Sequence, residues 1–289
     1  MAGAAALCLL LAALAFRAAL DRHVDRRYAF APVVPAVPAD GAAVARGRHL
    51  AVAIAACVAC HGDDFGGRAV VDNAVFGHIY APNLTRGAGG IGRSFTAADW
   101  ARAIRDGVGP DGRGLVVMPS DEYEHLSDAD LGALIAFLQR LPPVSHALPP
   151  TRLGPLAAGL IVLGRARMIA AETMRHPVPA TGAPAPGDTV ALGRYLATVG
   201  GCAGCHGPGL AGQRVPGAPP GTPAASDLTR SGIGASWTEA QFAGALRTGV
   251  RPDGTPINPF MPWKYAGQMS DGEIAAIWAY ARTLPPAHR

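Results

Sequence analysis

The stretch CVACH occupies residues 57–61, and a second stretch, CAGCH, occupies residues 202–206. Each has the C-x-x-C-H pattern of covalent haem attachment. The two thiols can add to the vinyl groups of one porphyrin, while the histidine binds the iron from one face. A lone C-x-x-C also occurs in zinc half-sites and redox dithiols, but two copies with the histidine attached predict two haems. The residues predicted to hold them are Cys57, Cys60, His61, Cys202, Cys205 and His206.

The residues around the two motifs indicate an internal duplication. GRHLA (47–51) precedes the first motif, and GRYLA (193–197) precedes the second. The order of the later phrases also matches: NLT (83–85) with DLT (227–229), AIRDGV (103–108) with ALRTGV (245–250), and LPP at the end of each half. Because the spacing stays nearly constant, we interpret the chain as one module copied twice.

Each module is predicted to be mostly helical. A first helix, from about Ala42 or Asp188, runs into the haem motif, and Thr96 and Thr238 are predicted N-caps. The sequences SDAD (127–130) and SDGE (270–273) resemble capping boxes and open closing helices with apolar residues at helical spacing. Long Gly/Pro loops without strand alternation lie between these helices. Such loops usually serve a site, here the wrapping of a haem and delivery of its second ligand.

A methionine followed by proline occurs at matching places, as Met118 and Met261. A thioether is a soft ligand, and His/Met coordination raises the reduction potential of haem iron. The alternative is that both side chains fill the core, but their equivalent positions favour ligation. The predicted iron ligands are therefore His61, Met118, His206 and Met261.

Other residues are weaker candidates for the haem sites. His78 could compete for the first iron, and His125 lies in the same module. Arg86 and Arg230, at matching places, could pair with haem propionates or be solvated loop residues. Met269 is matched by Leu126, which favours a packing role for that position.

Composition favours an exported electron-transfer protein over a nucleic-acid binder. The chain has 289 residues and a formal charge of +4, with no clustered basic tract, so we exclude a nucleic-acid partner. Four of its five cysteines belong to the two motifs, and the fifth is Cys8. Because thioether attachment of haem occurs outside the bacterial cytoplasm, the motifs predict export.

An apolar leader agrees with export. Residues 1–20 are predicted to be a membrane anchor or a cleaved signal peptide. The run just reaches the roughly 20 residues that a bilayer span requires, if Arg17 extends to the interface. The arginines at 22, 26 and 27 would then lie on the periplasmic side, against the positive-inside preference. We favour an anchor on the periplasmic side of the inner membrane, or a periplasmic protein if the leader is cleaved.

The predicted fold class is all-α, with two tandem domains behind the N-terminal helix. The expected order is the leader (1–20), a linker (21–40), domain 1 (41–146), a Pro-rich linker (147–186) and domain 2 (187–289). An apolar stretch at 153–170 is too short and too charged to span a bilayer. It is expected either to form a helix packed between the domains or to dock on a membrane or a partner.

The two modules resemble class I c-type cytochromes. The phrases PNLT (82–85), GIG (90–92), VGPDG (108–112) and HALPPT (146–151) are similar to those of multihaem cytochrome subunits that accept electrons from bacterial periplasmic alcohol and sugar dehydrogenases. The resemblance implies haem c, His/Met ligation and periplasmic electron transfer.

The leading functional hypothesis is a dihaem electron carrier rather than an enzyme. Its donor would be a dehydrogenase or a quinol-oxidising complex, and its acceptor an oxidase, a reaction centre or a soluble cytochrome. Two alternatives stay open: a dihaem enzyme, such as a peroxidase or thiosulfate-oxidising cytochrome, and a haem subunit of a respiratory complex. Six-coordinate iron at both sites favours the carrier.

Overall fold

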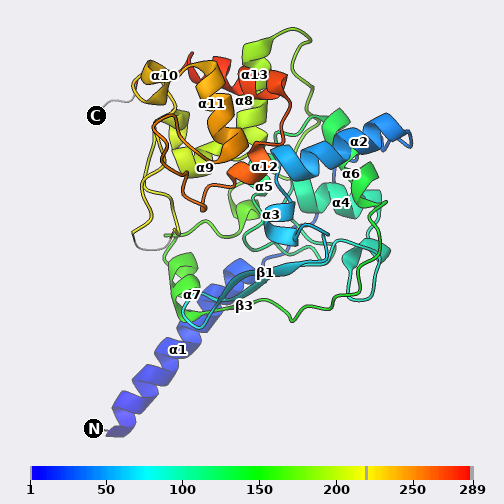
Figure 1. Ribbon diagram of the computed structural model, residues 1–289. Coiled ribbons are helices and arrows are strands. Elements are labelled where there is room, and N and C mark those ends of the chain that lie inside the picture. The colour runs from blue at the N-terminus through cyan, green and yellow to red at the C-terminus, as the bar shows by residue number, and fades with distance from the viewer. Residues whose placement is uncertain (1, 219–220, 287–289) are drawn as a thin grey trace. The chain divides into compact units, whose positions relative to one another are not determined.

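The computed structural model describes residues 2–218 and 221–286 (Figure 1). The chain folds into two compact units, and neither is one continuous segment. Unit 1 contains 1–35, 60–124 and 139–180, and unit 2 contains 36–59, 125–138 and 181–289. The first repeat is therefore divided, because its first and last helices belong to unit 2 and its haem-motif histidine and loops belong to unit 1.

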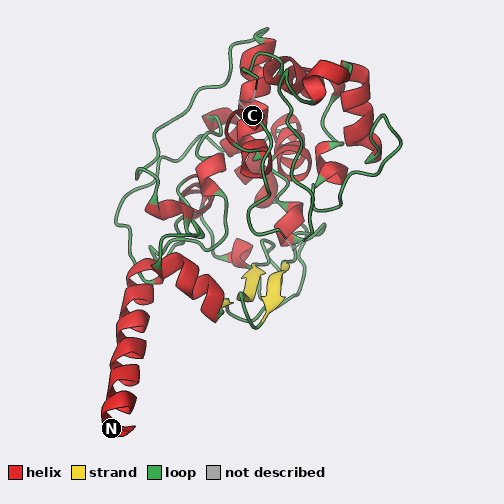
Figure 2. Ribbon diagram, turned by 90° about the vertical axis from the view of Figure 1, so that its left-hand side faces the viewer, coloured by secondary structure: helices red, strands yellow, loops and turns green. Residues whose placement is uncertain are grey.

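The elements of unit 2 in the described part of the chain are helices joined by loops, with isolated β-bridges between loop residues (Figure 2). Its elements are α2 (Gly41–His49), η1 (Leu50–Ile54), α6 (Asp128–Leu138), α8 (Thr189–Val199), α9 (Cys202–His206), η4 (Pro208–Leu210), α10 (Ile233–Ser236), α11 (Glu239–Thr248), α12 (Trp263–Ala266) and α13 (Asp271–Ala281). The short helix α3 (Val58–His61) carries the first haem motif across the boundary between the units.

The first and last helices of each repeat pack as a pair, α2 on α6 and α8 on α13. A glycine allows the close approach in both. A Cβ atom on Gly47 would lie 2.0 Å from the Ala133 carbonyl oxygen, and one on Gly193 would lie 1.8 Å from that of Ala276. Helix packing thus requires glycine as the first residue of both GRHLA and GRYLA.

A polar cluster joins the two helix pairs inside unit 2, and we call it the crossing cluster. Its members are Arg46, His49, Asp130, Tyr195 and Glu273. Arg46 donates two hydrogen bonds of 2.9 Å to Asp130 and one of 2.9 Å to Glu273. His49 Nε2 lies 2.6 Å from Glu273 Oε2, and the Tyr195 hydroxyl donates to Asp130 at 2.7 Å. His49 and Tyr195 are equivalent in the repeats, as are Asp130 and Glu273, so the contact is reciprocal.

Most predicted helix starts are confirmed, but the first helix does not run unbroken into its motif. Thr96, Thr238 and Ser270 each cap a helix in a capping box. After α2, however, the chain forms the π-helix η1, and Ala56 then takes a left-handed conformation with φ 44°. Gly201 has φ 65° at the equivalent place, where glycine accepts it readily. Ala56 therefore has a strained backbone conformation, and such conformations are most frequent at functional sites.

Unit 1 contains the strands that the sequence did not predict. β1 (Arg68–Asn73), β2 (Gly77–Ala81) and β3 (Arg152–Leu153) form an antiparallel sheet in that order. The pairing slips between Ala69 and Val71, so the strands lack the regular alternation that would have revealed them. The helical elements of unit 1 are α1 (Ala2–Val24), η2 (Ile91–Arg93), α4 (Ala97–Arg105), α5 (Ser120–Tyr123), α7 (Pro155–Val162) and η3 (Ala170–Glu172).

The linker forms part of the core of unit 1. Val108, Ile169 and Ala171 are buried together, and Val24, Tyr28, Phe30 and Val116 pack against them. His176 stacks on Phe30 with ring centroids 5.1 Å apart. The end of α1 is held by His23, whose Nδ1 lies 2.7 Å from Glu172. The helix α7 packs on α1. The chain leaving α1 is thus held tightly against the linker.

Helix α1 has the length and composition of a membrane-crossing helix. It has 23 residues, and its most apolar stretch of 18 residues has a mean hydropathy of 2.1 and contains no buried residue. Signal sequences share these properties.

Candidate haem sites

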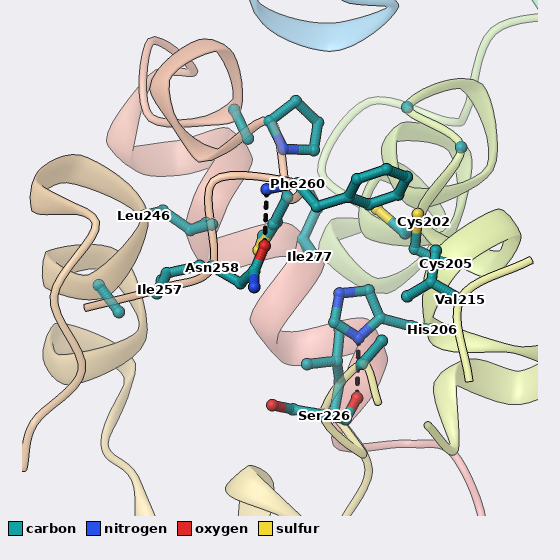
Figure 3. Close-up of a pocket in the computed structure, with 18 of the residues that line it drawn as sticks. Cys202, Cys205, His206, Val215, Ser226, Leu246, Ile257, Asn258, Phe260 and Ile277 are labelled. Carbon is teal, nitrogen blue, oxygen red and sulfur yellow. Dashed lines mark hydrogen bonds between the residues drawn. The ribbon is translucent and has the colours of Figure 1, made fainter. Parts of the chain in front are cut away.

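The second haem motif borders a large apolar cavity in unit 2 (Figure 3). About 1340 Å³ of empty space lies between its walls, a volume that includes open solvent at the mouth. Cys202, Cys205 and His206 lie at its wall on α9, and Met261 and Pro262 border it from the loop before α12. The structure therefore brings the predicted thiols, histidine and methionine of this repeat around one space. Apolar walls suit a porphyrin, whose faces are apolar and whose burial replaces a core of larger side chains.

A backbone carbonyl orients the ring of His206. Its Nδ1 lies 2.8 Å from the Ser226 carbonyl oxygen, as the dashed line in Figure 3 shows. A carbonyl can only accept, so Nδ1 carries the proton and Nε2 keeps its lone pair. Burial lowers the pKa of His206, although the Ser226 contact partly opposes this, so the neutral form is favoured. Neutral imidazole with an oriented second nitrogen is the form that binds a metal.

The first repeat has the same arrangement at His61. This side chain is 7% exposed, and its Nδ1 donates to the Pro82 carbonyl oxygen at 2.9 Å. Burial lowers the pKa of His61, against the smaller effect of this hydrogen bond. Pro82 and Ser226 each come directly before the matched NLT and DLT phrases, so both repeats use the same carbonyl position.

The NLT phrase fixes this carbonyl in place. The Asn83 amide donates to the carbonyl oxygens of Val144 and His146 at 2.7 and 3.2 Å. Its side-chain oxygen accepts from the backbone and hydroxyl of Thr85 at 2.9 and 2.8 Å. Both Asn83 and Thr85 are fully buried. The matching NLT and DLT phrases were recognised in the sequence, but their role in positioning the preceding carbonyl was not predicted.

Met118 lies in a loop of unit 1 that the linker holds. Val117, directly before it, has φ 67°, and its amide donates to the Met168 carbonyl at 2.6 Å. Val116 also pairs with Ile169. No pattern in the sequence indicated that the Pro-rich linker would support this loop. His61, Cys60 and Met118 belong to unit 1, and Cys57 belongs to unit 2.

Three residues of the first repeat form part of the second cavity. Ala53, Ile54 and Ala56 border it, and all three belong to unit 2. They come from the π-helix and the left-handed turn directly before Cys57. Sequence comparison of the repeats could not find them, because each repeat was expected to enclose its own haem.

The weaker candidates differ in their exposure. His78 is 48% exposed on β2, and its Nδ1 lies 2.5 Å from Asp72, so it is not directed into a buried site. His125 is exposed, as are Arg86 and Arg230. Met269 is 4% exposed and borders the second cavity, so it combines packing with lining.

Two protein families match the chain, one in each repeat. Residues 42–138 match the family described as "Cytochrome C oxidase, cbb3-type, subunit III". Residues 190–285 match the family described as "Cytochrome c". Both matched ranges contain a C-x-x-C-H motif and the first and last helices of a repeat.

Curated relatives match across most of the chain. The fructose dehydrogenase cytochrome subunit of Gluconobacter japonicus is 32% identical over 84% of this chain and 52% of its own length. The cytochrome c subunit of the quinone alcohol dehydrogenase of Gluconacetobacter polyoxogenes is 31% identical over 86% and 57%. The gluconate 2-dehydrogenase cytochrome c subunit of Pantoea cypripedii is 35% identical over 59% and 39%.

The chain spans about half the length of the first two of these relatives. Their names describe cytochrome subunits, which agrees with the expectation of an electron-transfer protein rather than a catalytic one. Together with the two family matches and the helical repeats, they confirm the expected fold class, with the hairpin of unit 1 as its exception. The chain consists of two tandem cytochrome c domains that follow an N-terminal apolar helix.

Proposed function

We propose that the chain is a dihaem electron carrier that receives electrons from a periplasmic dehydrogenase and passes them to a respiratory acceptor. The observation that carries the proposal is the histidine of each C-x-x-C-H motif, which is buried and oriented by a backbone carbonyl in both repeats. A redox dithiol has no need for such an imidazole, and the duplicated C-x-x-C-H motif favours haem iron over zinc as the metal. An iron site needs this imidazole.

Each repeat supplies a complete set of groups for haem c. Cys57 and Cys60 in the first, and Cys202 and Cys205 in the second, would form the thioether bonds. His61 and His206 would be the proximal ligands, and Met118 and Met261 the distal ligands. When bound, haem supplies a one-electron couple at each site. The protein residues hold it, keep water from its faces and set its potential.

The names of the relatives support a dehydrogenase as the donor. They are cytochrome subunits of fructose, alcohol and gluconate dehydrogenases. A quinol-oxidising complex is the other donor class that the sequence suggests, and an oxidase, a reaction centre or a soluble cytochrome would be the acceptor. Helix α1 would hold the carrier on the periplasmic side of the inner membrane.

The exposed position of His78 argues against a catalytic first haem. A peroxidase or thiosulfate-oxidising cytochrome requires an open or unusually ligated iron with acid–base groups beside it. His78 lies on the outward face of β2 with Asp72, and nothing in its surroundings directs it toward His61.

Intact mass and redox titration of the exported chain test the proposal together. We expect a mass increase of two haems, low-spin spectra from both, and two reversible one-electron transitions. A chain without covalent tetrapyrrole would refute the haem assignment. A high-spin ferric haem combined with turnover of peroxide or thiosulfate would replace the carrier with an enzyme.

A further inference from the structure

Helix α7 has an apolar face that the protein leaves uncovered. None of its eight residues (PLAAGLIV) has a polar side chain. Ala157, Ala158 and Ile161 are buried on one side. Leu156, Leu160 and the C-cap residue Leu163 recur at intervals of four and three residues, the spacing of one helix face. Leu156 and Leu163 are 41% and 72% exposed, and Leu160 is half-buried. A helix on an aqueous surface has polar residues on its outward face, and this one has leucines.

The tip of the β1–β2 hairpin extends the same apolar surface. Val75 is 54% exposed and Phe76 is 37% exposed. Their carbonyl oxygens accept hydrogen bonds from the amides of Leu156 and Gly154, at 3.0 and 2.8 Å. The Asn73 side chain caps the turn by accepting from both tip amides. The tip is thereby fixed beside the start of α7, and we call Val75, Phe76, Leu156, Leu160 and Leu163 the apolar patch.

The patch lies at the base of α1, where a bilayer surface would be. Figures 1 and 2 show α7 and the sheet beside the end of α1 that enters unit 1. Residues 2–18 are exposed, and partial burial begins at Ala19. Seventeen helical residues span about 26 Å at 1.5 Å per residue, close to the roughly 30 Å of a hydrocarbon core. The part of α1 on which α7 packs therefore starts where the span ends.

Arginines surround this level of the molecule. Arg17 and Arg22 lie on α1, Arg152 precedes α7, and Arg165 and Arg167 follow it. Arg17 pairs with Asp21 at 2.9 Å. All five arginines are exposed. Segments that lie in the headgroup region of a membrane commonly combine leucine and phenylalanine with neighbouring arginines.

We propose that the apolar patch inserts into the surface of the bilayer that α1 crosses. It would hold unit 1 against the membrane by a second contact, so that the anchor is not a flexible tether. This inference rests on the proposed anchoring by α1. Hydrogen bonds join the start of α7 to the hairpin tip, and His23 contacts Glu172 at the base of α1. These bonds would hold the apolar patch at the same depth in the membrane as the end of the α1 span.

Quenching by nitroxide-labelled lipids tests this contact in the full haem-loaded chain. Native Cys8, exposed on α1, takes a bimane label and reports the anchor. In a Cys8→Ser background, Phe76→Cys and Leu163→Cys report the patch. Val250→Cys is the matched control, because Val250 is apolar and 43% exposed but belongs to unit 2. Fluorescence is measured in phosphatidylethanolamine–phosphatidylglycerol vesicles with and without the nitroxide-labelled lipid. The ratio of the two intensities cancels quenching by the haems.

We expect headgroup-level nitroxides to quench the labels at 76 and 163 about twofold, with the label at 250 unaffected. Quenching at Cys8 by deep nitroxides without any at 76 and 163 would overturn the patch and leave the anchor standing. The reverse result would support the patch and refute the anchor. Labels at 76 and 163 that are shielded from aqueous iodide but not quenched by lipid would show a protein cover, and would also overturn the proposal.

Discussion

At the scale of single residues, the proposed haem sites depend on a few side chains whose partners are backbone carbonyls. His61 and His206 are each directed by one such carbonyl. Both histidines could be proposed as iron ligands from the sequence, because C-x-x-C-H is a local pattern. It could not reveal the carbonyls, because they lie about twenty residues further along the chain and become partners only after the loops fold back.

Replacement of Met261 by alanine should remove the sulfur-to-iron absorption band of the second haem and lower its potential. A thioether favours ferrous iron, so its loss should cost on the order of 0.1 V, within the ~0.8 V that axial ligands span. Met269→Leu is the control, since Met269 borders the same cavity and is assigned to packing. An unchanged band in Met261→Ala, or its loss in Met269→Leu, would reassign the ligand.

Replacement of Asn83 by alanine should destabilise the first domain. The change removes the Asn83 amide that donates to the Val144 and His146 carbonyl oxygens, and the side-chain oxygen that accepts from buried Thr85, at a cost of about 2 kcal/mol. Chemical denaturation followed by haem absorbance measures the loss. Asn73→Ala, at an exposed hairpin turn of the same unit, is the matched control and should cost about half as much. Equal costs would mean that burial of Asn83 contributes nothing.

At the scale of elements, helix crossings explain why the two repeats kept some residues and changed others. Both crossings require a glycine, which is present as Gly47 and Gly193. The SDAD sequence, by contrast, forms only half of a capping box. Ser127 accepts from the Asp130 amide at 3.1 Å, but the Asp130 carboxylate binds Arg46 and Tyr195 instead of returning to the cap.

Alanine at Gly47 or Gly193 should separate the paired helices. The added Cβ would overlap a carbonyl oxygen, and overpacking of this kind costs about 1–3 kcal/mol. Gly244 offers the control, since it lies within α11 with nothing within 4 Å of a Cβ. Gly244→Ala should instead stabilise the helix by about 0.5–1 kcal/mol. Thermal melts of the three variants would show whether the signs differ as expected.

Stability should fall in acid through Glu273 of the crossing cluster. Burial alone would raise the pKa of Glu273, but the Ser270 hydrogen bond and the neighbouring His49 and Arg46 outweigh it and lower this pKa. A lowered pKa means that the carboxylate stabilises the fold above its ordinary titration range and that this contribution is lost as the pH falls through the folded-state value.

Melting temperature against pH, compared between the wild type and Glu273→Gln, measures this contribution. The glutamine variant should be less stable at neutral pH, and the difference should shrink toward acid. Asp271→Asn is the control, because Asp271 is on the same helix with a side chain 96% exposed. A difference that does not change with pH would assign Glu273 a purely steric role.

At the scale of the whole molecule, the duplication and the helical domains were predictable, but the division into units was not. Matched phrases reveal homology between segments, not which segments fold together. The helices α2 and α6 share a unit with the second repeat, and the crossing cluster links them to it. The linker was expected to contain a helix that packs between the domains or docks on a membrane or a partner, but its residues 168–178 also support the Met118 loop and the base of α1.

The wall that Ala53, Ile54 and Ala56 contribute to the second cavity has a consequence for dissecting the protein. A fragment containing residues 187–289 alone retains both of its thiols and both of its expected axial ligands, yet lacks one side of its enclosure. Water entering there would favour the more highly charged ferric state, so this fragment should titrate at a lower potential than the same centre in the intact chain. The redox properties of the two halves, measured separately, would therefore not add up to those of the whole.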